Sequence, residues 1–309
     1  MGRGARHQYG DCRTMSLRAE MILDAKLVMR DGLARINAAA EIDTRGYVND
    51  WHSNLLPGID PGLIEGDFRA GKGSELDNKF QAAHSSAALA VNVFGPFRDG
   101  RDPFAVPGLG DLKLEKFERT FTTGLVGRIP PHLDISAIGL RGVVAIESKC
   151  LEYFTPKAAS FAPAYQTLNK CRYTPWFAEM ERLRDSPKDC EALDAAQLIK
   201  HAFGLINSAG PGSTLIYIFW KPSDADRHQL FRQHRSEIAR FAEQVAGGGP
   251  DFRAMSYPEL WKSWVQGDSA KLRDHAERLA IRYGGSLGSY EGYSRVNGRK
   301  TDAGFFDDD

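Results

Sequence analysis

The segment PHLDISAIGLRGVVAIESKC, residues 131–150, predicts a β-hairpin with charged side chains at its open end. Gly139-Leu140-Arg141-Gly142 has the composition of a tight turn, and apolar, often β-branched residues flank it on both sides. If the two strands pair symmetrically about this turn, Asp134 lies directly across from Glu147. Residues opposed in this way have Cβ atoms roughly 4.5–5.5 Å apart. The hairpin therefore predicts two carboxylates within reach of one cation.

The residues after Glu147 add a positive charge to the same face. Side chains alternate along a strand, so Glu147 and Lys149 share one face while Ser148 points to the other. Two bare carboxylates that face each other repel, and a divalent cation between them removes that repulsion. Two carboxylates, a cation and a neighbouring ammonium form an arrangement typical of a metal-dependent phosphodiesterase.

A surface hairpin with ordinary charges is the alternative, since 26% of the residues are charged. Two other acidic-x-Lys triplets, Asp77-Asn78-Lys79 and Asp111-Leu112-Lys113, show that such spacing arises readily. The first lies in a stretch with a helical pattern, and the second lacks a long apolar strand before it. Glu147-Ser148-Lys149 instead ends the run GVVAI, which is typical of a strand buried on both faces. Charges at the end of a buried strand favour a functional site.

On these residues the chain resembles the PD-(D/E)XK nuclease superfamily, whose fold is restriction-endonuclease-like. Asp134 matches the first half of the motif, and Glu147 with Lys149 matches the second half. One departure is Pro131, which stands three residues before Asp134 instead of next to it. The segment HSSAALAVNVFGPF, residues 84–97, also resembles a bacterial subgroup of restriction-endonuclease-like proteins.

The resemblance implies an α/β fold with a mixed central β-sheet flanked by helices in the order αβββαβ. Extra helices are expected at both ends of the chain. The expected core comprises a helix over 73–97 with a capping box at Ser74 and Asp77, a strand over 117–127, the hairpin, a helix over 160–171, and a strand over 213–222. Helical spacing also predicts helices over 194–207, 227–247 and 269–284.

The resemblance extends the site to two further residues. Glu75 matches the helix-borne acid of the superfamily, although the helix dipole alone also favours Glu in a first turn. Gln166 matches a polar position on the helix after the Lys strand, with an exposed helix residue as its alternative.

Basic residues outside the motif are candidates for contacts with nucleic-acid phosphates. They are Arg128, Lys221, His228, Arg232 and Arg235, the last three aligned along the helix over 227–247. A solvated helix face is the favoured alternative for that row. Within the helix over 194–207, a surface location is likewise favoured over a role at the site for three polar residues, Gln197, Lys200 and His201.

Composition agrees with a soluble enzyme and excludes several other classes of protein. Forty basic and forty acidic residues cancel, so the chain lacks the positive charge of a DNA-coating protein. No apolar run is long enough for a membrane span, and the first residues lack the apolar core of a signal peptide, so we expect a cytoplasmic protein. The four cysteines and eight histidines are scattered without zinc-site spacing, so we expect reduced thiols and no structural zinc.

We expect one nuclease-like domain over residues 15–284, with the catalytic core at about 74–222. The ends, 1–14 and 285–309, are rich in Gly, Ser and charge and are expected to be flexible.

The expected activity is Mg²⁺-dependent endonucleolytic hydrolysis of DNA, with Mn²⁺ able to take the place of Mg²⁺. Asp134, Glu147 and the backbone carbonyl of Ser148 are the expected metal ligands, and Glu75 is an additional one. Lys149 is expected to orient the attacking water or to help deprotonate it. Two alternatives stay open: a non-catalytic nucleic-acid-binding protein that retains the fold, and a repair or recombination nuclease of the same superfamily. A homodimer would suit double-strand cleavage.

Overall fold

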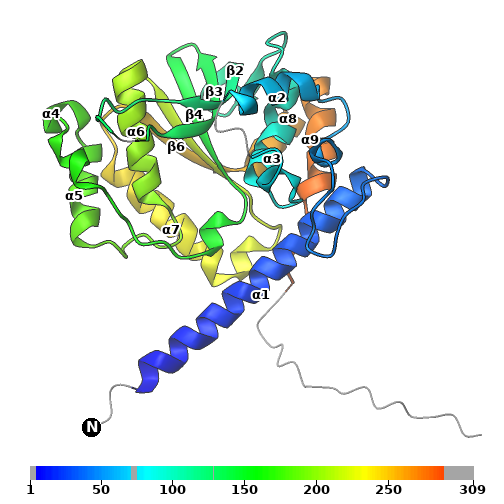
Figure 1. Ribbon diagram of the computed structural model, residues 1–309, viewed down its shortest axis with the longest axis horizontal. Helices are drawn as coiled ribbons and strands as arrows, with labels where there is room; N and C mark the ends of the chain where they lie inside the picture. The colour runs from blue at the N-terminus through cyan, green and yellow to red at the C-terminus, as the bar shows by residue number, and fades with distance from the viewer. Residues whose placement is uncertain (1–4, 71–74, 128, 289–309) are drawn as a thin grey trace, which may run out of the picture.

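Six strands form one mixed β-sheet in which spatial order follows chain order (Figure 1). The computed structural model describes residues 5–70, 75–127 and 129–288. Strands β1 to β4 pair antiparallel, whereas β4, β5 and β6 run parallel. Their bounds are β1 Phe104–Val106, β2 Gly110–Thr120, β3 His132–Gly139, β4 Gly142–Lys149, β5 Thr214–Phe219 and β6 Asp251–Ser256.

The register predicted for the hairpin is confirmed. Pairing runs from Gly139 opposite Gly142 to Ile135 opposite Ile146, symmetric about Leu140 and Arg141. Gly142 has φ +114°, a backbone conformation that side chains other than glycine rarely adopt. The next step along the two strands brings Asp134 and Glu147 to the open end of the hairpin.

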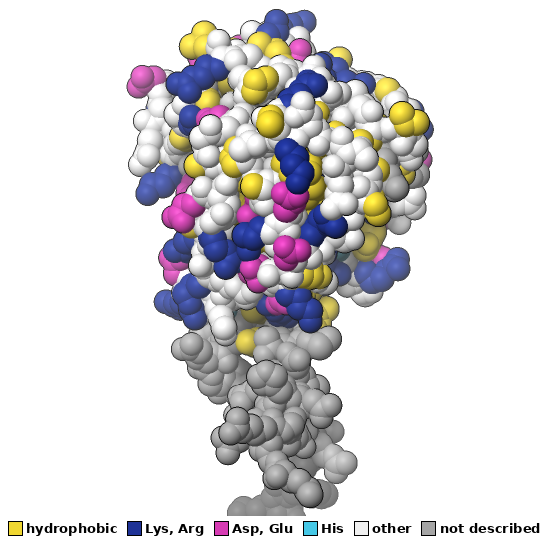
Figure 2. Space-filling model, turned by 90° about the vertical axis from the view of Figure 1, so that its left-hand side faces the viewer, with side chains coloured by type: hydrophobic (Ala, Val, Ile, Leu, Met, Phe, Trp, Pro, Cys, Tyr) yellow, Lys and Arg dark blue, Asp and Glu magenta, His cyan; other side chains and the backbone are white. Residues whose placement is uncertain are grey.

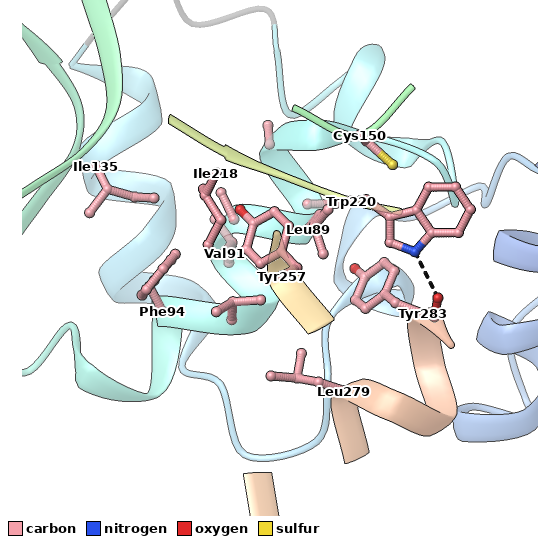
Figure 3. Packing of buried hydrophobic residues seen from close by; sticks show 14 of the residues in the cluster. Leu89, Val91, Phe94, Ile135, Cys150, Ile218, Trp220, Tyr257, Leu279 and Tyr283 are labelled. Carbon is pink, nitrogen blue, oxygen red and sulfur yellow. Dashed lines mark hydrogen bonds between the residues drawn. The ribbon is translucent and has the colours of Figure 1, made fainter. Parts of the chain in front are cut away.

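Helices cover both faces of the sheet and create two hydrophobic cores. Helices α1, α2, α3, α8 and α9 enclose the first core, whereas α5 and α6 enclose the second and α7 contributes to both. Figure 3 shows the first core, where Trp220 Nε1 donates a hydrogen bond to the carbonyl oxygen of Tyr283 at 2.8 Å. The helix bounds are α1 Ala5–Ile36, α2 Pro61–Arg69, α3 Ser86–Phe94, α4 Lys170–Tyr173, α5 Trp176–Asp185, α6 Ala195–Ala209, α7 Gln229–Gln244, α8 Tyr257–Gln266 and α9 Ala270–Tyr283.

The α/β class and several of the expected elements are confirmed. The predicted strand over 213–222 is β5, and the helices predicted over 194–207, 227–247 and 269–284 are α6, α7 and α9. Strands β1 and β6 and helix α8 were not predicted. Among the described residues, no helix is long and apolar enough to span a membrane.

The strand predicted over 117–127 was placed too late in the chain. Strand β2 begins at Gly110 and ends at Thr120. An irregularity in its pairing with β3, between Leu114 and Lys116, interrupts the alternation of buried residues. The period-2 pattern that would reveal the strand is therefore broken in its middle.

The helix predicted over 73–97 was also wrong in extent. Helix α3 begins only at Ser86, after Ser85 caps it by accepting a hydrogen bond from the backbone N–H of Ala88 at 3.2 Å. Asp77 lies in a turn before the short 3₁₀ helix Lys79–Gln81, so it caps no helix, and Ser74 lies outside the described residues.

The helix predicted over 160–171 is broken as well. The segment forms a 3₁₀ helix, Pro163–Thr167, and then the four-residue α4. Leu168 between them has an extended backbone. The helix that packs on β4 and β5 is α6 instead.

The N-terminal end of the chain is helical where a flexible segment was expected. Helix α1 begins at Ala5, within the segment expected to be flexible, and its first half extends away from the body in Figure 1. Of the tail expected over 285–309, residues 289–309 lie outside the described residues. The division into domains stays a prediction.

Candidate active site

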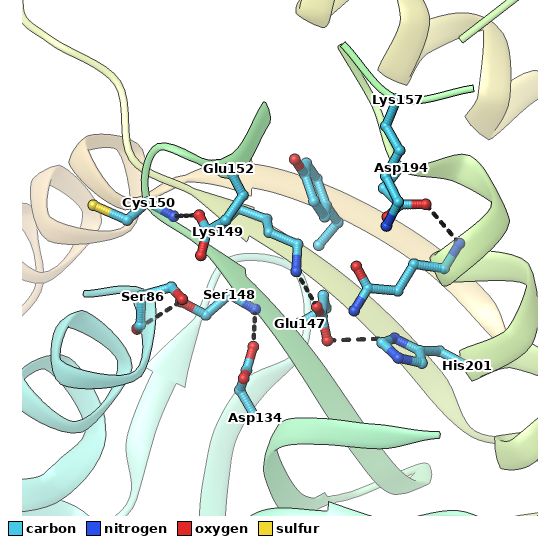
Figure 4. A network of polar contacts seen from close by, with 12 residues as sticks. Ser86, Asp134, Glu147, Ser148, Lys149, Cys150, Glu152, Lys157, Asp194 and His201 are labelled. Carbon is cyan, nitrogen blue, oxygen red and sulfur yellow. Dashed lines mark hydrogen bonds and ion pairs between the residues drawn. The ribbon is translucent and has the colours of Figure 1, made fainter. Parts of the chain in front are cut away.

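The end of β4 presents its charged residues to α6 and its hydroxyl residue to α3 and α8. Glu147 is 2% exposed and pairs with Lys149 Nζ through Oε1. Its second oxygen, Oε2, lies 3.3 Å from Nδ1 of His201, a buried residue of α6 (Figure 4). Both oxygens of Glu147 thus contact nitrogen atoms of the site.

Ser148 links this end of β4 to three other elements. Its backbone N–H donates a 2.6 Å hydrogen bond to Asp134 Oδ2 in β3. Its hydroxyl donates to the carbonyl oxygen of Ser86 at 3.3 Å and lies 2.7 Å from the hydroxyl of Tyr257 at the start of α8. Asp134 is therefore held at the strand end by a backbone donor that engages one of its two oxygens.

A third strand brings another acid to the site. Pairs on either side of Glu118 in β2, Phe117 with Ile135 and Arg119 with Leu133, place Glu118 across from Asp134. Three carboxylates, Glu118, Asp134 and Glu147, thus occupy corresponding positions on β2, β3 and β4. We call this set the carboxylate row.

Burial and neighbouring negative charges raise the pKa values of two carboxylates of the row, Asp134 and Glu118. Burial is the largest cause that raises the pKa of Asp134 well above its usual value, followed by the charges of Glu147 and Glu118. Burial, then Glu75 and Glu147, raises the pKa of Glu118 to about 8. Glu75 therefore lies close enough to interact with the row.

Of the two basic groups of the site, Lys149 is charged at neutral pH and His201 is not. Burial acts to lower the pKa of Lys149, but the charges of Glu147, Glu152 and Asp134 outweigh it and raise that pKa above its usual value. Burial lowers the pKa of His201, and Glu147 only partly offsets this effect. At neutral pH, Lys149 is an ammonium ion and His201 a neutral imidazole.

The oxygen donors of the site suit a hard divalent cation, although no complete ligand set is assembled. Within the described ranges, no three His, Cys, Asp or Glu side chains converge closely enough to hold a metal ion. Asp134 and Glu147 nevertheless interact as buried like charges, and an oxygen-binding cation such as Mg²⁺ would relieve their repulsion. The residues fit a cation held by two carboxylates, a backbone carbonyl and water.

Comparison with known proteins identifies the family. The model of the family described as Restriction Endonuclease associating with ARP, REase-ARP, matches residues 34–284. The chain belongs to the REase-ARP family. No curated protein and no solved structure matches it. The match covers the whole sheet and every helix from α2 to α9, so this REase-ARP protein is restriction-endonuclease-like along most of its length.

The REase-ARP fold unites four of the residues predicted for the site. Asp134, Glu147, Ser148 and Lys149 meet where β3 begins and β4 ends. Glu75 interacts electrostatically with Glu118 of the carboxylate row, but it lies in a bend and not in a helix. Gln166 lies beside the guanidinium of Arg184 on α5, and this contact involves no member of the row.

The predicted phosphate-contacting residues have acidic or carbonyl partners. Lys221 pairs with Glu259 at 3.0 Å, and His228 Nε2 lies 3.4 Å from Asp224. Two others contact one acid in the short 3₁₀ helix before α7. Arg235 pairs with the carboxylate of Asp226, and Arg232 donates to the backbone carbonyl oxygen of Asp226 at 2.8 Å. Figure 2 shows acidic side chains among the basic ones on the face it presents. Arg128 lies outside the described residues.

Glu118 was not among the residues predicted for the site, and His201 was expected on the surface. The surface location favoured for His201 was wrong, because it is 3% exposed and contacts Glu147. Its position on the same helical face as Leu198 and Leu205 was the available signal. Glu118 has φ +53°, the only non-glycine residue with a positive φ in the described part of the chain. Nothing in the sequence indicates that conformation.

Proposed function

We propose that this REase-ARP protein hydrolyses phosphodiester bonds in DNA at the carboxylate row, with the help of a divalent cation. The observation that carries the proposal is the meeting of Asp134, Glu147 and a charged Lys149 at the ends of two paired strands. Buried like charges cost stability, so their presence calls for a function. Perturbed ionisable groups of this kind cluster at active sites.

Asp134, Glu147 and the backbone carbonyl of Ser148 would hold the cation, with Glu75 as an outer ligand through water. When bound, Mg²⁺ lowers the pKa of a coordinated water and neutralises charge on the phosphate. Glu147 would exchange its ion pair with Lys149 for the cation, while Asp134 stays held by the N–H of Ser148. His201 would hold the second oxygen of Glu147 and so orient the carboxylate.

In the metal-free site, the raised pKa of Lys149 favours one of the two roles expected of this residue. While Lys149 is paired with Glu147 it is protonated and does not take a proton from water, so general-base catalysis is disfavoured in that state. Its ammonium would instead donate hydrogen bonds to a phosphate oxygen and to the attacking water. Charge that develops on the phosphate in the transition state would be offset by Lys149.

The motif and the order of elements support our proposal that the site is of the PD-(D/E)XK type. Strands β2, β3 and β4, then α6 and β5, follow one another as in the pattern βββαβ. Asp134 on the second of these strands and Glu147-Ser148-Lys149 on the third occupy the motif positions.

A cleavage assay tests the proposal. Purified protein should nick or cut plasmid and linear DNA with Mg²⁺ or Mn²⁺ and lose that activity in EDTA. Three variants, Asp134→Asn, Glu147→Gln and Lys149→Met, should each lower the rate about 100-fold or more. The exposed Asp111 and Lys113 of β2 form a similar triplet, so the control Asp111→Asn/Lys113→Met should keep full activity.

The competing function is DNA binding without cleavage. It would be favoured if the protein retained DNA in a gel-shift assay but cut no substrate with any divalent metal. Full activity of Glu147→Gln would also contradict the proposed site. The homodimer stays a prediction, which light scattering of the purified protein would check.

A further inference from the structure

A cavity of about 290 Å³ lies between α1, the loop before α2, the start of α3 and the segment that follows β4. We call it the α1–α3 pocket. Its polar wall includes Lys26, Tyr47, Glu75, Lys79, His84 and Glu152, and apolar side chains form much of the remainder. Residues of this wall come from segments far apart in the chain.

The α1–α3 pocket adjoins the carboxylate row. Glu75 and Lys79 line the pocket, and both interact electrostatically with Glu118 of the row. Ser86, in the same wall, accepts a hydrogen bond from the hydroxyl of Ser148. Figure 4 shows Ser86 and Glu152 near the end of β4 where Ser148 and Lys149 lie. A ligand in the pocket would therefore be a near neighbour of the bond cleaved at the row.

The lining combines groups that recognise the two parts of a nucleotide. Lys26 and Lys79 supply positive charge from different elements, which suits a phosphate. Tyr47 and His84 supply rings that meet edge to face with centroids 5.8 Å apart. Burial, then the charge of Lys26, lowers the pKa of His84 to about 4, so this ring is neutral and suited to packing against a base.

The charges of the lining and the volume of the cavity limit the class of ligand that the α1–α3 pocket can bind. Glu75 and Glu152 balance the two lysines in number, which disfavours a small, highly charged anion on its own. A phosphate joined through a sugar to a neutral base fits such a wall better. The volume is at the lower end for small-ligand sites, so a base pair within a duplex cannot enter, whereas one unstacked nucleotide can.

We propose that the α1–α3 pocket binds one unpaired nucleotide of the substrate strand, next to the bond that is cleaved. Its phosphate would lie against Lys26 and Lys79 and its base against Tyr47 and His84. This inference rests on the proposed function for the identity of the strand, but the binding site itself does not depend on hydrolysis.

Calorimetric titration of the full chain with dAMP in EDTA tests the binding site. We expect dAMP to bind more tightly than deoxyadenosine or inorganic phosphate. Tyr47→Leu and Lys26→Gln should each weaken dAMP binding about tenfold, because stacking and charge contacts of this kind have about that effect. Tyr47→Phe, which keeps the ring, and Lys262→Gln, on the exposed side of α8, should bind as the wild type does. No binding of dAMP, equal binding of inorganic phosphate, or no effect of either pocket variant would overturn the proposal.

A second measurement connects the pocket to the substrate. The wild type should cut duplexes with one unpaired nucleotide beside the cleaved bond faster than fully paired duplexes, and Tyr47→Leu should remove this preference. Equal rates for the two wild-type reactions would refute the assignment to substrate. If dAMP binds as expected while no DNA is cut under any condition, the proposed function fails and the nucleotide site stands.

Discussion

At the scale of single residues, the site brings together more acidic side chains than basic ones, and a bound cation would balance them. Glu118, Asp134 and Glu147 lie on adjacent strands, whereas Lys149 is the one cation that directly pairs with a member of the row among the described residues. Glu118 also holds a left-handed backbone conformation that costs an L-residue roughly 1–2 kcal/mol. Unfavourable features of this kind persist where the surrounding structure and the function require them.

Metal-free protein should lose stability as the pH rises from about 4.5 to about 8. In this window unfolded Glu118, with a pKa of 4.5, has released the proton that the folded chain still holds, because its folded pKa is about 8. Glu118 by itself should lower the free energy of unfolding by less than about 1.4 kcal/mol per pH unit, because it is only half-buried and solvent screens its charge. Asp134, whose pKa is also raised, adds to the fall.

Urea unfolding at several pH values, with and without Mg²⁺, measures this slope. Mg²⁺ should flatten it by binding the deprotonated row. Glu118→Gln should reduce the slope even without metal, and an unchanged slope in that variant would contradict the role given to Glu118.

The variant Glu118→Gly separates the backbone strain at this position from the contribution of the carboxylate to cleavage. Relief of the left-handed strain minus the entropy of glycine should raise the free energy of unfolding by up to about 1 kcal/mol. Cleavage should still fall about 10- to 100-fold, because the carboxylate beside Asp134 is lost. Thermal melts and the plasmid assay measure the two effects; a variant that is both fully active and more stable would show that the carboxylate is dispensable.

At the scale of elements, α6 positions the site by packing closely against the chain that leaves β2. Gly204 of α6 lies next to the backbone of Phe121, where an added Cβ would be 2.5 Å from the carbonyl oxygen and 2.8 Å from Cγ of Pro131. His201 lies on the same helix, one turn earlier. The position of α6 therefore controls the contact between His201 and Glu147.

Gly204→Ala should destabilise the protein by about 1–3 kcal/mol, because the clash outweighs the helix propensity gained. Its cleavage rate should fall too, since α6 must shift. The control is Gly66→Ala in α2, where an added Cβ meets no atom within 4 Å, and it should stabilise by about 0.5–1 kcal/mol. Denaturant unfolding of both variants checks the pair, and equal effects would argue against the packing explanation.

At the scale of the whole molecule, one buried arginine joins segments from both ends of the chain. Arg282 of α9 is fully buried and donates hydrogen bonds to the carbonyl oxygens of Met29 in α1 and Ala83, and to the side chain of Asn54. Its guanidinium also stacks on Tyr283, 4.3 Å from the ring centroid. This network secures α1 and α9, which pack on each other beside the α1–α3 pocket.

Arg282→Lys should lower the free energy of unfolding by about 2–4 kcal/mol, because an ammonium cannot reproduce the forked contacts of a guanidinium in a buried site. Chemical unfolding measures the change. Arg278→Lys, on the exposed side of α9, should be nearly neutral. A similar loss in both variants would mean that helix composition, and not the buried network, is responsible.

The sequence by itself determined the hairpin, its register and the three motif residues, because turn composition and alternation along a strand are local properties. It also indicated β5, α6, α7 and α9 through their periodic patterns. The limits of β2 and α3 escaped it, because a pairing irregularity and a cap eleven residues after the expected one interrupt the periodic signal.

Only the tertiary structure decided that Glu118 and His201 join Asp134 and Glu147. These residues come from β2 and from α6, and their meeting depends on strand pairing and helix packing between distant segments. Such contacts leave no fixed spacing in the chain. The local motif therefore predicts the chemistry, whereas the surroundings that tune its charges arise from the folded whole.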